Sequence, residues 1–191
     1  VHTGIDGLRQ IEREVDEFAG NLLMPGDLLR EWISNQRIDL HVLSAIAKRF
    51  QVSFEALCIR FIKFTKQRAI LVYWDNGFVK YEWRSSSAVK TRARIRRNGD
   101  PQEPLPGTLV SDASIEQEWD GTEMSAAVWC PEEAAHMKLW EFKHTYSARD
   151  RILTLLLLEN AEPRSWDRSW QDEESFDSFD QFVSNGQLPV R

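Results

Sequence analysis

The 191-residue sequence lacks long apolar runs, since none approaches the roughly 18 consecutive apolar residues of a membrane-spanning helix. It is also poor in cysteine: only Cys58 and Cys130 occur, both among apolar neighbours. Two such cysteines exclude a disulfide framework and indicate free thiols in a reducing cytoplasm. Positive charge is not in excess either, because the formal net charge is −6. We therefore expect a cytoplasmic protein with no membrane contact, and no binding of polyanions by the molecule as a whole.

The residues that are present suit a folded protein with a substantial core. The sequence is 42% hydrophobic and 28% charged, which fits one or two small domains. Most of its eight tryptophans lie beyond residue 70, and a β-rich C-terminal part would use them in its core.

The N-terminal stretch has the most informative pattern. Wound as a helix, it places its apolar side chains in one arc about 140° wide. These are Leu8, Ile11, Val15, Phe18, Ala19, Leu22 and Leu23. Glu12 falls inside the arc, whereas Glu14 points elsewhere. A carboxylate on a buried apolar stripe is costly unless it is paired, and either a metal ion or a buried Arg or Lys could be its partner.

The segment IEREVDEFAGNLLMP, residues 11–25, resembles the part that follows the catalytic motif in ImmA/IrrE-type zinc metallopeptidases. These are bacterial and phage proteins that cleave helix-turn-helix repressors. In that family two zinc-binding histidines come from an HExxH helix, and a Glu on the next helix is the third ligand. The resemblance implies that Glu12 is this metal ligand. It further implies that Asp16, where the family commonly has Asn, orients the metal site; the alternative is a partly exposed helical Asp.

The sequence departs from the family because it contains no HExxH motif. Its histidines are His2, His41, His136 and His144, and no two of them are spaced as in that motif. The opening VHTG resembles the family segment shortly after the catalytic helix, so we expect the printed sequence to start there. In HExxH peptidases zinc lowers the pKa of a bound water and the motif Glu is the general base.

One carboxylate does not hold zinc, so we expect zinc in the full-length protein but no zinc binding and no cleavage by this chain alone. A separate site built from His136, His144 and nearby carboxylates is the alternative.

Residues 26–68 are predicted to be helical, and the family often has a helix-turn-helix-like segment here. Asp39 and Ser53 can cap two helices joined by a turn at Gln51-Val52. Basic residues in 26–68 outnumber acidic ones two to one, and Lys48 and Arg49 are candidates for contact with nucleic acid or a partner. The residues after Ser53 are poor at reading bases, which favours a helical scaffold over DNA binding.

The rest of the chain is predicted to be a β-rich module with a tail. Residues 69–83 form the clearest hairpin, because Asn76-Gly77 suits a tight turn. Further strands are expected at 126–130, 139–144 and 152–158, with a loop at 84–107. That loop is basic and free of acidic residues over positions 84–97. Its Arg92, Arg94, Arg96 and Arg97 are candidates for contact with the acidic tail, a partner protein or nucleic-acid phosphate.

These patterns predict an α+β fold in three parts: helices over 1–68, a β-rich module over 69–160, and an acidic tail over 161–191. The tail is expected to be poorly ordered or docked through its aromatic residues. The expected function is that of a fragment of a zinc endopeptidase whose substrate is a helix-turn-helix repressor. The alternative is a non-enzymatic regulator that binds DNA or a partner and carries a β-rich sensor module.

Overall fold

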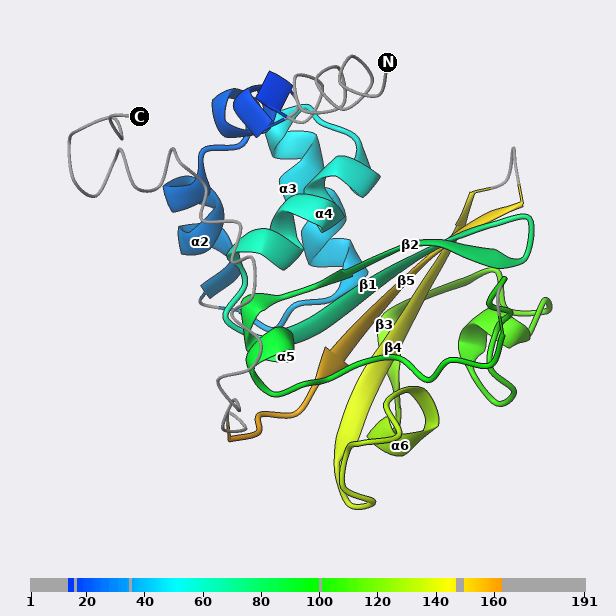
Figure 1. The fold of residues 1–191 in the computed structure, drawn as a ribbon. Helices are drawn as coiled ribbons and strands as arrows, with labels where there is room; N and C mark the ends of the chain where they lie inside the picture. The colour runs from blue at the N-terminus through cyan, green and yellow to red at the C-terminus, as the bar shows by residue number, and fades with distance from the viewer. Residues whose placement is uncertain (1–13, 16, 35, 100, 147–149, 163–191) are drawn as a thin grey trace, which may run out of the picture.

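The computed structural model describes residues 14–15, 17–34, 36–99, 101–146 and 150–162. Helices come first and an antiparallel five-stranded sheet follows, which confirms the α+β prediction (Figure 1). The first helix covers residues 14–15 and 17–23. It is followed by α2 (Gly26–Ser34), α3 (Leu40–Phe50) and α4 (Phe54–Phe64). None of the helices in the described ranges is both long and apolar enough to cross a membrane.

The two predicted helix caps are present. The Asp39 side chain accepts a hydrogen bond from the Val42 amide at 2.7 Å, and Ser53 accepts one from the Ala56 amide at 3.1 Å. Between them Gln51 adopts a left-handed conformation with φ 56°, which ends α3. The helix pair of the helix-turn-helix prediction therefore forms, with its short turn where the sequence placed it.

The sheet has the strand order β2-β1-β5-β4-β3, and all neighbouring strands are antiparallel. The strands are β1 (Arg68–Asp75), β2 (Phe78–Arg84), β3 (Gln117–Ser125), β4 (Lys138–Tyr146) and β5 (Arg151–Leu158). The predicted hairpin is β1–β2, and its turn residues Asn76 and Gly77 have φ values of 53° and 81°. The expected strands at 139–144 and 152–158 correspond to β4 and β5.

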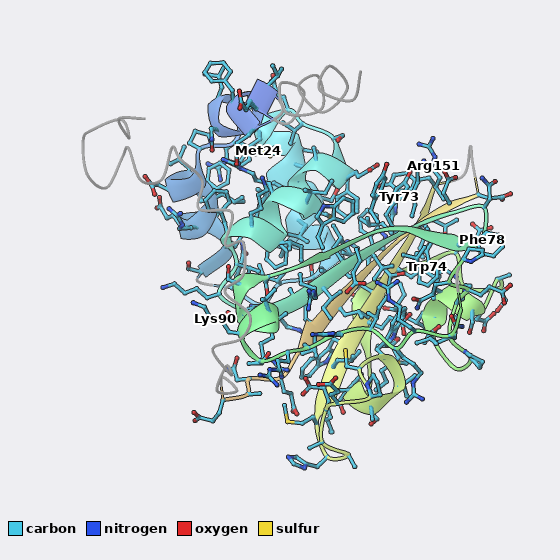
Figure 2. All side chains as sticks on the ribbon, viewed as in Figure 1. Met24, Tyr73, Trp74, Phe78, Lys90 and Arg151 are labelled. Atoms are coloured by element: carbon cyan, nitrogen blue, oxygen red, sulfur yellow. The ribbon has the colours of Figure 1, made fainter. Side chains whose placement is uncertain are left out.

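Each face of the sheet carries its own hydrophobic core, since successive side chains of a strand point to opposite faces. Tyr73 belongs to the core shared with α2, α3 and α4, whereas Trp74 belongs to the core on the other face (Figure 2). We call these the helix face and the loop face. The helix-face core joins residues from before and after position 68, and the domain division at that position stays a prediction.

Short elements and loops cover the loop face: α5 (Ser86–Lys90), a 3₁₀ turn at Leu109–Ser111, and α6 (Ala126–Trp129). Buried polar contacts fix them to the sheet. Glu141 accepts hydrogen bonds from the Val110 amide at 3.2 Å and from Trp129 Nε1 at 3.0 Å. Lys143 Nζ donates to the carbonyl oxygens of Leu109 at 2.9 Å and Asp112 at 2.8 Å.

Two of the predicted elements were wrong. Residues 126–130 are not a strand, because Ala126–Trp129 form α6 and the strand β3 ends just before them. The interval 84–107 is not all loop, because it contains α5. A short apolar run does not distinguish a strand from a buried helical turn, which explains the first error.

Candidate functional site

The first helix is held against α4 by a polar contact centred on Arg60, whose side chain is buried. Arg60 Nε donates to the Met24 carbonyl oxygen at 3.3 Å, and its Nη2 donates to the same oxygen at 3.2 Å and also to Asn21 Oδ1. Farther out, Lys63 Nζ lies 3.5 Å from Glu17 Oε1. Met24 lies at the end of this helix, beside α4 (Figure 2). The side of the first helix that faces the protein is therefore largely polar.

The apolar side of the same helix faces outward. Phe18 is 69% exposed and Leu22 is 68% exposed, and Val15 and Leu23 are also more than half exposed. Amphipathic helices of soluble proteins normally show the reverse arrangement, with the apolar stripe against the core. Contiguous exposed apolar surface commonly marks a place where another segment or protein binds. We call Val15, Phe18, Leu22 and Leu23 the apolar face.

The residues predicted to bind or orient zinc, Glu12 and Asp16, lie outside the described residues, as does His2. Glu14, which the helical periodicity places off the apolar arc, is helical and exposed. In the described ranges no group of three or more His, Cys, Asp or Glu side chains is arranged to hold a metal ion. The resemblance to the family assigns one ligand in this chain, Glu12, whereas a catalytic zinc needs about three protein ligands. The residues present therefore do not fit a complete zinc site at this helix.

His136 and His144 do not form the alternative metal site. His136 is exposed in the turn before β4, and His144 lies near the far end of that strand. The strand between them spans about 20 Å, which is too far for one ion to bridge.

The structure instead places His144 in an aromatic cluster that the sequence did not reveal. Its ring lies 5.1 Å from Phe54, 5.4 Å from Trp119 and 4.5 Å from Tyr146, measured between ring centroids. Its Nδ1 lies 2.8 Å from Gln117 Oε1, so Nδ1 carries the proton that this bond needs. Burial lowers the pKa of His144, which favours the neutral ring. The alternation of WEFKHTY could have shown that Trp140, Phe142 and His144 share one face.

The surface that a DNA-reading helix would need is covered in this fold. α4 contacts α2, α3, β1 and β2, and its Cys58 is fully buried. At its start, the Phe54 ring lies 5.7 Å from that of Trp119 and 5.1 Å from that of His144. Lys48 and Arg49 lie on the last turn of α3, where the Arg49 guanidinium lies 4.4 Å from the centre of the Trp32 ring. The covered α4 favours the scaffold interpretation of this helix pair over DNA reading.

The loop after α5, which carries the basic residues, packs on the loop face, whereas α3, which carries Lys48 and Arg49, packs on the helix face (Figure 1). Arg92 has a positive φ of 60°, Arg96 Nη2 donates to the Ala127 carbonyl oxygen at 3.2 Å, and Arg97 Nη2 lies 2.9 Å from Glu82 Oε2. Arg94 and Arg97 line a surface pocket next to β2. The two groups of candidate contact residues therefore do not form one continuous surface.

Comparison with known proteins identifies the N-terminal part of the chain. No curated protein matches the sequence. A family model does match, over residues 4–61, and it is the one described as Peptidase_M78, the IrrE N-terminal-like domain. The match covers the first helix, α2, α3 and most of α4. It confirms the predicted resemblance: over residues 4–61 this chain is related to the ImmA/IrrE-type metallopeptidase family.

Proposed function

We propose that this chain is part of a zinc-dependent endopeptidase that cleaves a helix-turn-helix repressor. The family match supports the peptidase relationship over residues 4–61. Zinc, with Glu12 as its ligand, and the repressor substrate are the implications of the ImmA/IrrE resemblance in the sequence. In this proposal the two histidine ligands belong to a polypeptide segment outside the 191 residues.

The apolar face is the observation that carries the proposal. Helical periodicity puts Glu12 in the same arc as Val15, Phe18 and Leu22, and those three side chains are more than half exposed. Burial of a large apolar side chain stabilises a protein by about 1.5–3 kcal/mol, so packing of a further helix on the apolar face would be favourable. A zinc ion between that helix and Glu12 would also provide the carboxylate with its partner.

The test uses a longer polypeptide in which an HExxH segment precedes Val1. We expect this protein to retain about one zinc per chain and to cleave its repressor. Glu12→Gln should release the zinc and abolish cleavage, because a neutral amide is a poor zinc ligand. Glu14→Gln is the matched control and should leave both unchanged, because Glu14 lies off the apolar arc. Zinc is measured by elemental analysis of the purified protein, and cleavage by electrophoresis of a purified repressor.

Two results would contradict the proposal. Full zinc content and full activity of Glu12→Gln would remove Glu12 from the ligand set. Tight binding of one zinc by the 191-residue chain alone would show that the histidine pair is not needed from elsewhere.

A further inference from the structure

The loop face has a basic pocket that the proposed peptidase function does not use. Its volume is about 690 Å³, and it lies between β2 and the loop that follows α5. Its charged lining residues are Lys80, Glu82, Arg84, Arg94 and Arg97, and its apolar and aromatic lining residues are Val79, Tyr81 and Ile95. Four cationic residues and one carboxylate thus line the pocket, in a protein whose formal net charge is −6.

Ion pairs orient the pocket's cations without neutralising them all. Glu82 Oε2 lies 2.9 Å from Arg97 Nη2, and Glu82 Oε1 lies 3.9 Å from Arg84 Nε. At the rim, Lys80 Nζ lies 3.0 Å from Asp75 Oδ2, a contact that raises the pKa of Lys80. Even with Asp75 included, two positive charges remain in excess. Guanidinium groups with this orientation suit the oxygens of phosphate, because their planar donors can bond two oxygens at once.

The backbone that carries these arginines is anchored on both sides of the pocket. The Val79 amide donates to the Gln102 carbonyl oxygen at 3.0 Å, and Gln102 Oε1 accepts from Arg97 Nη1 at 3.0 Å. The Ala93 amide donates to the Ala88 carbonyl oxygen at 2.9 Å, and Ile95 is buried in the loop-face core. A site fixed in this way needs little ordering when a ligand binds, which favours affinity.

The geometry points to a binding site for a phosphate group, with the phosphate oxygens on Arg84, Arg94 and Arg97. Tyr81 lines the pocket, but its ring points to the helix face, where it lies 6.2 Å from that of Tyr73 and 5.5 Å from that of Trp83. A free nucleotide and a single-stranded nucleic acid both carry such a phosphate group. The site is independent of zinc and of the apolar face.

The first experiment measures binding of ATP and of a short oligo-dT strand, by calorimetry and by fluorescence anisotropy respectively. Arg84→Gln with Arg94→Gln should weaken binding of the preferred probe by about tenfold or more, through loss of charge-assisted hydrogen bonds. Lys48→Gln with Arg49→Gln is the matched control: it removes the same charge from α3 and should change binding less than about twofold. If both double variants lose the same amount of affinity for the probe, binding depends on general electrostatic attraction rather than on this pocket. That result would overturn the proposal.

The second experiment identifies the source of the phosphate. If ATP displaces oligo-dT and binds more tightly, the ligand is a free nucleotide; if only the strand binds, the ligand is a nucleic acid. Failure of ATP, oligo-dT and pyrophosphate to bind at millimolar concentration would overturn the proposal, whatever the outcome of the zinc experiment.

Discussion

At the scale of single residues, the loop face depends on ionisable side chains that are buried and paired. Arg68 is the clearest case: it forms an ion pair with Glu133, donates to Thr91 Oγ1 at 2.8 Å, and donates to the Glu159 carbonyl oxygen at 2.6 Å. These contacts join the start of β1 to α5, to the loop after α6 and to the end of β5. Such pairs are costly to break, because removal of one partner leaves a buried charge.

Cys130, next to this ion pair on the loop face, should make the protein less stable in alkali. Burial raises its pKa to about 12, whereas the thiol of an unfolded chain has a pKa of about 8.5. Below that lower pKa the thiol's contribution to stability is fully present, and it is lost as pH rises toward the folded pKa. The loss approaches about 1.4 kcal/mol per pH unit.

Urea unfolding of the wild type and of Cys130→Ala at several pH values between about 8 and 10 measures this effect. The free energy of unfolding should fall more steeply with pH in the wild type than in the variant. Taking the difference between the two proteins removes the contributions of the other titrating groups, including Cys58. Parallel curves for the two proteins would contradict the prediction.

At the scale of secondary-structure elements, Arg60 decides how the first helix attaches to α4. Arg60 and Arg30 both lie over the Phe64 ring, at 4.5 and 4.7 Å from its centre. Only Arg60 is buried and bonded to the Met24 carbonyl oxygen. The two arginines therefore form a matched pair that separates stacking on the ring from the buried hydrogen bonds.

Arg60→Met should destabilise the protein by about 1.5–3 kcal/mol, the usual worth of hydrogen bonds to a charged group. Arg30→Met should cost less than about 1 kcal/mol, because its ion pair with Asp27 is on the surface. Hydrogen exchange should also show faster opening of the first helix in Arg60→Met alone. If both variants lose the same free energy of unfolding, the stabilisation comes from stacking on Phe64 and not from the hydrogen bonds of Arg60.

Elements with a strong local signal were predictable from the sequence. The β1–β2 hairpin has Asn76-Gly77 between apolar runs, and α3 and α4 have the capping residues Asp39 and Ser53. β3 was not predicted, because QEWDGTEMS is polar, lies at the edge of the sheet and is interrupted near Gly121, whose φ is 86°. An edge strand buries little of its surface, so its sequence carries little of the alternation that marks a strand.

The candidate sites were predictable to different degrees. The apolar arc is a local periodicity, so the sequence alone predicted an amphipathic helix over residues 8–23. It did not show which side of the helix faces the protein, since that depends on Arg60, which lies far along the chain. The basic pocket was only partly predictable: Arg94 and Arg97 stood out in the loop, but Arg84 joins them through the pairing of β2 with the sheet.

At the scale of the whole molecule, the sheet separates two surfaces with different chemistry. The helices α2, α3 and α4 pack on one face of the sheet (Figure 1). The basic pocket lies between β2 and the loop that follows α5, which covers the other face. Substitutions in the first helix and at the pocket arginines lie far apart on opposite sides of the sheet and should act additively. The peptidase proposal and the phosphate proposal can therefore be tested separately in the same protein.

The apolar face gives the last prediction. Phe18→Ser with Leu22→Ser should change the stability of the 191-residue chain by less than about 0.5 kcal/mol, because both side chains are largely exposed. Binding of the dye ANS should decrease, because the variant has less exposed apolar surface. Phe61→Ala is the control: Phe61 is fully buried, so its loss should cost about 3–5 kcal/mol.

In the longer polypeptide that carries an HExxH segment, the same double substitution should be costly, because the apolar face is then covered. Burial of each of the two side chains contributes about 1.5–3 kcal/mol, so loss of both should measurably lower the free energy of unfolding and weaken zinc binding. A large loss of stability already in the 191-residue chain would show that the apolar face is covered in solution. It would thereby remove the observation on which the peptidase proposal depends.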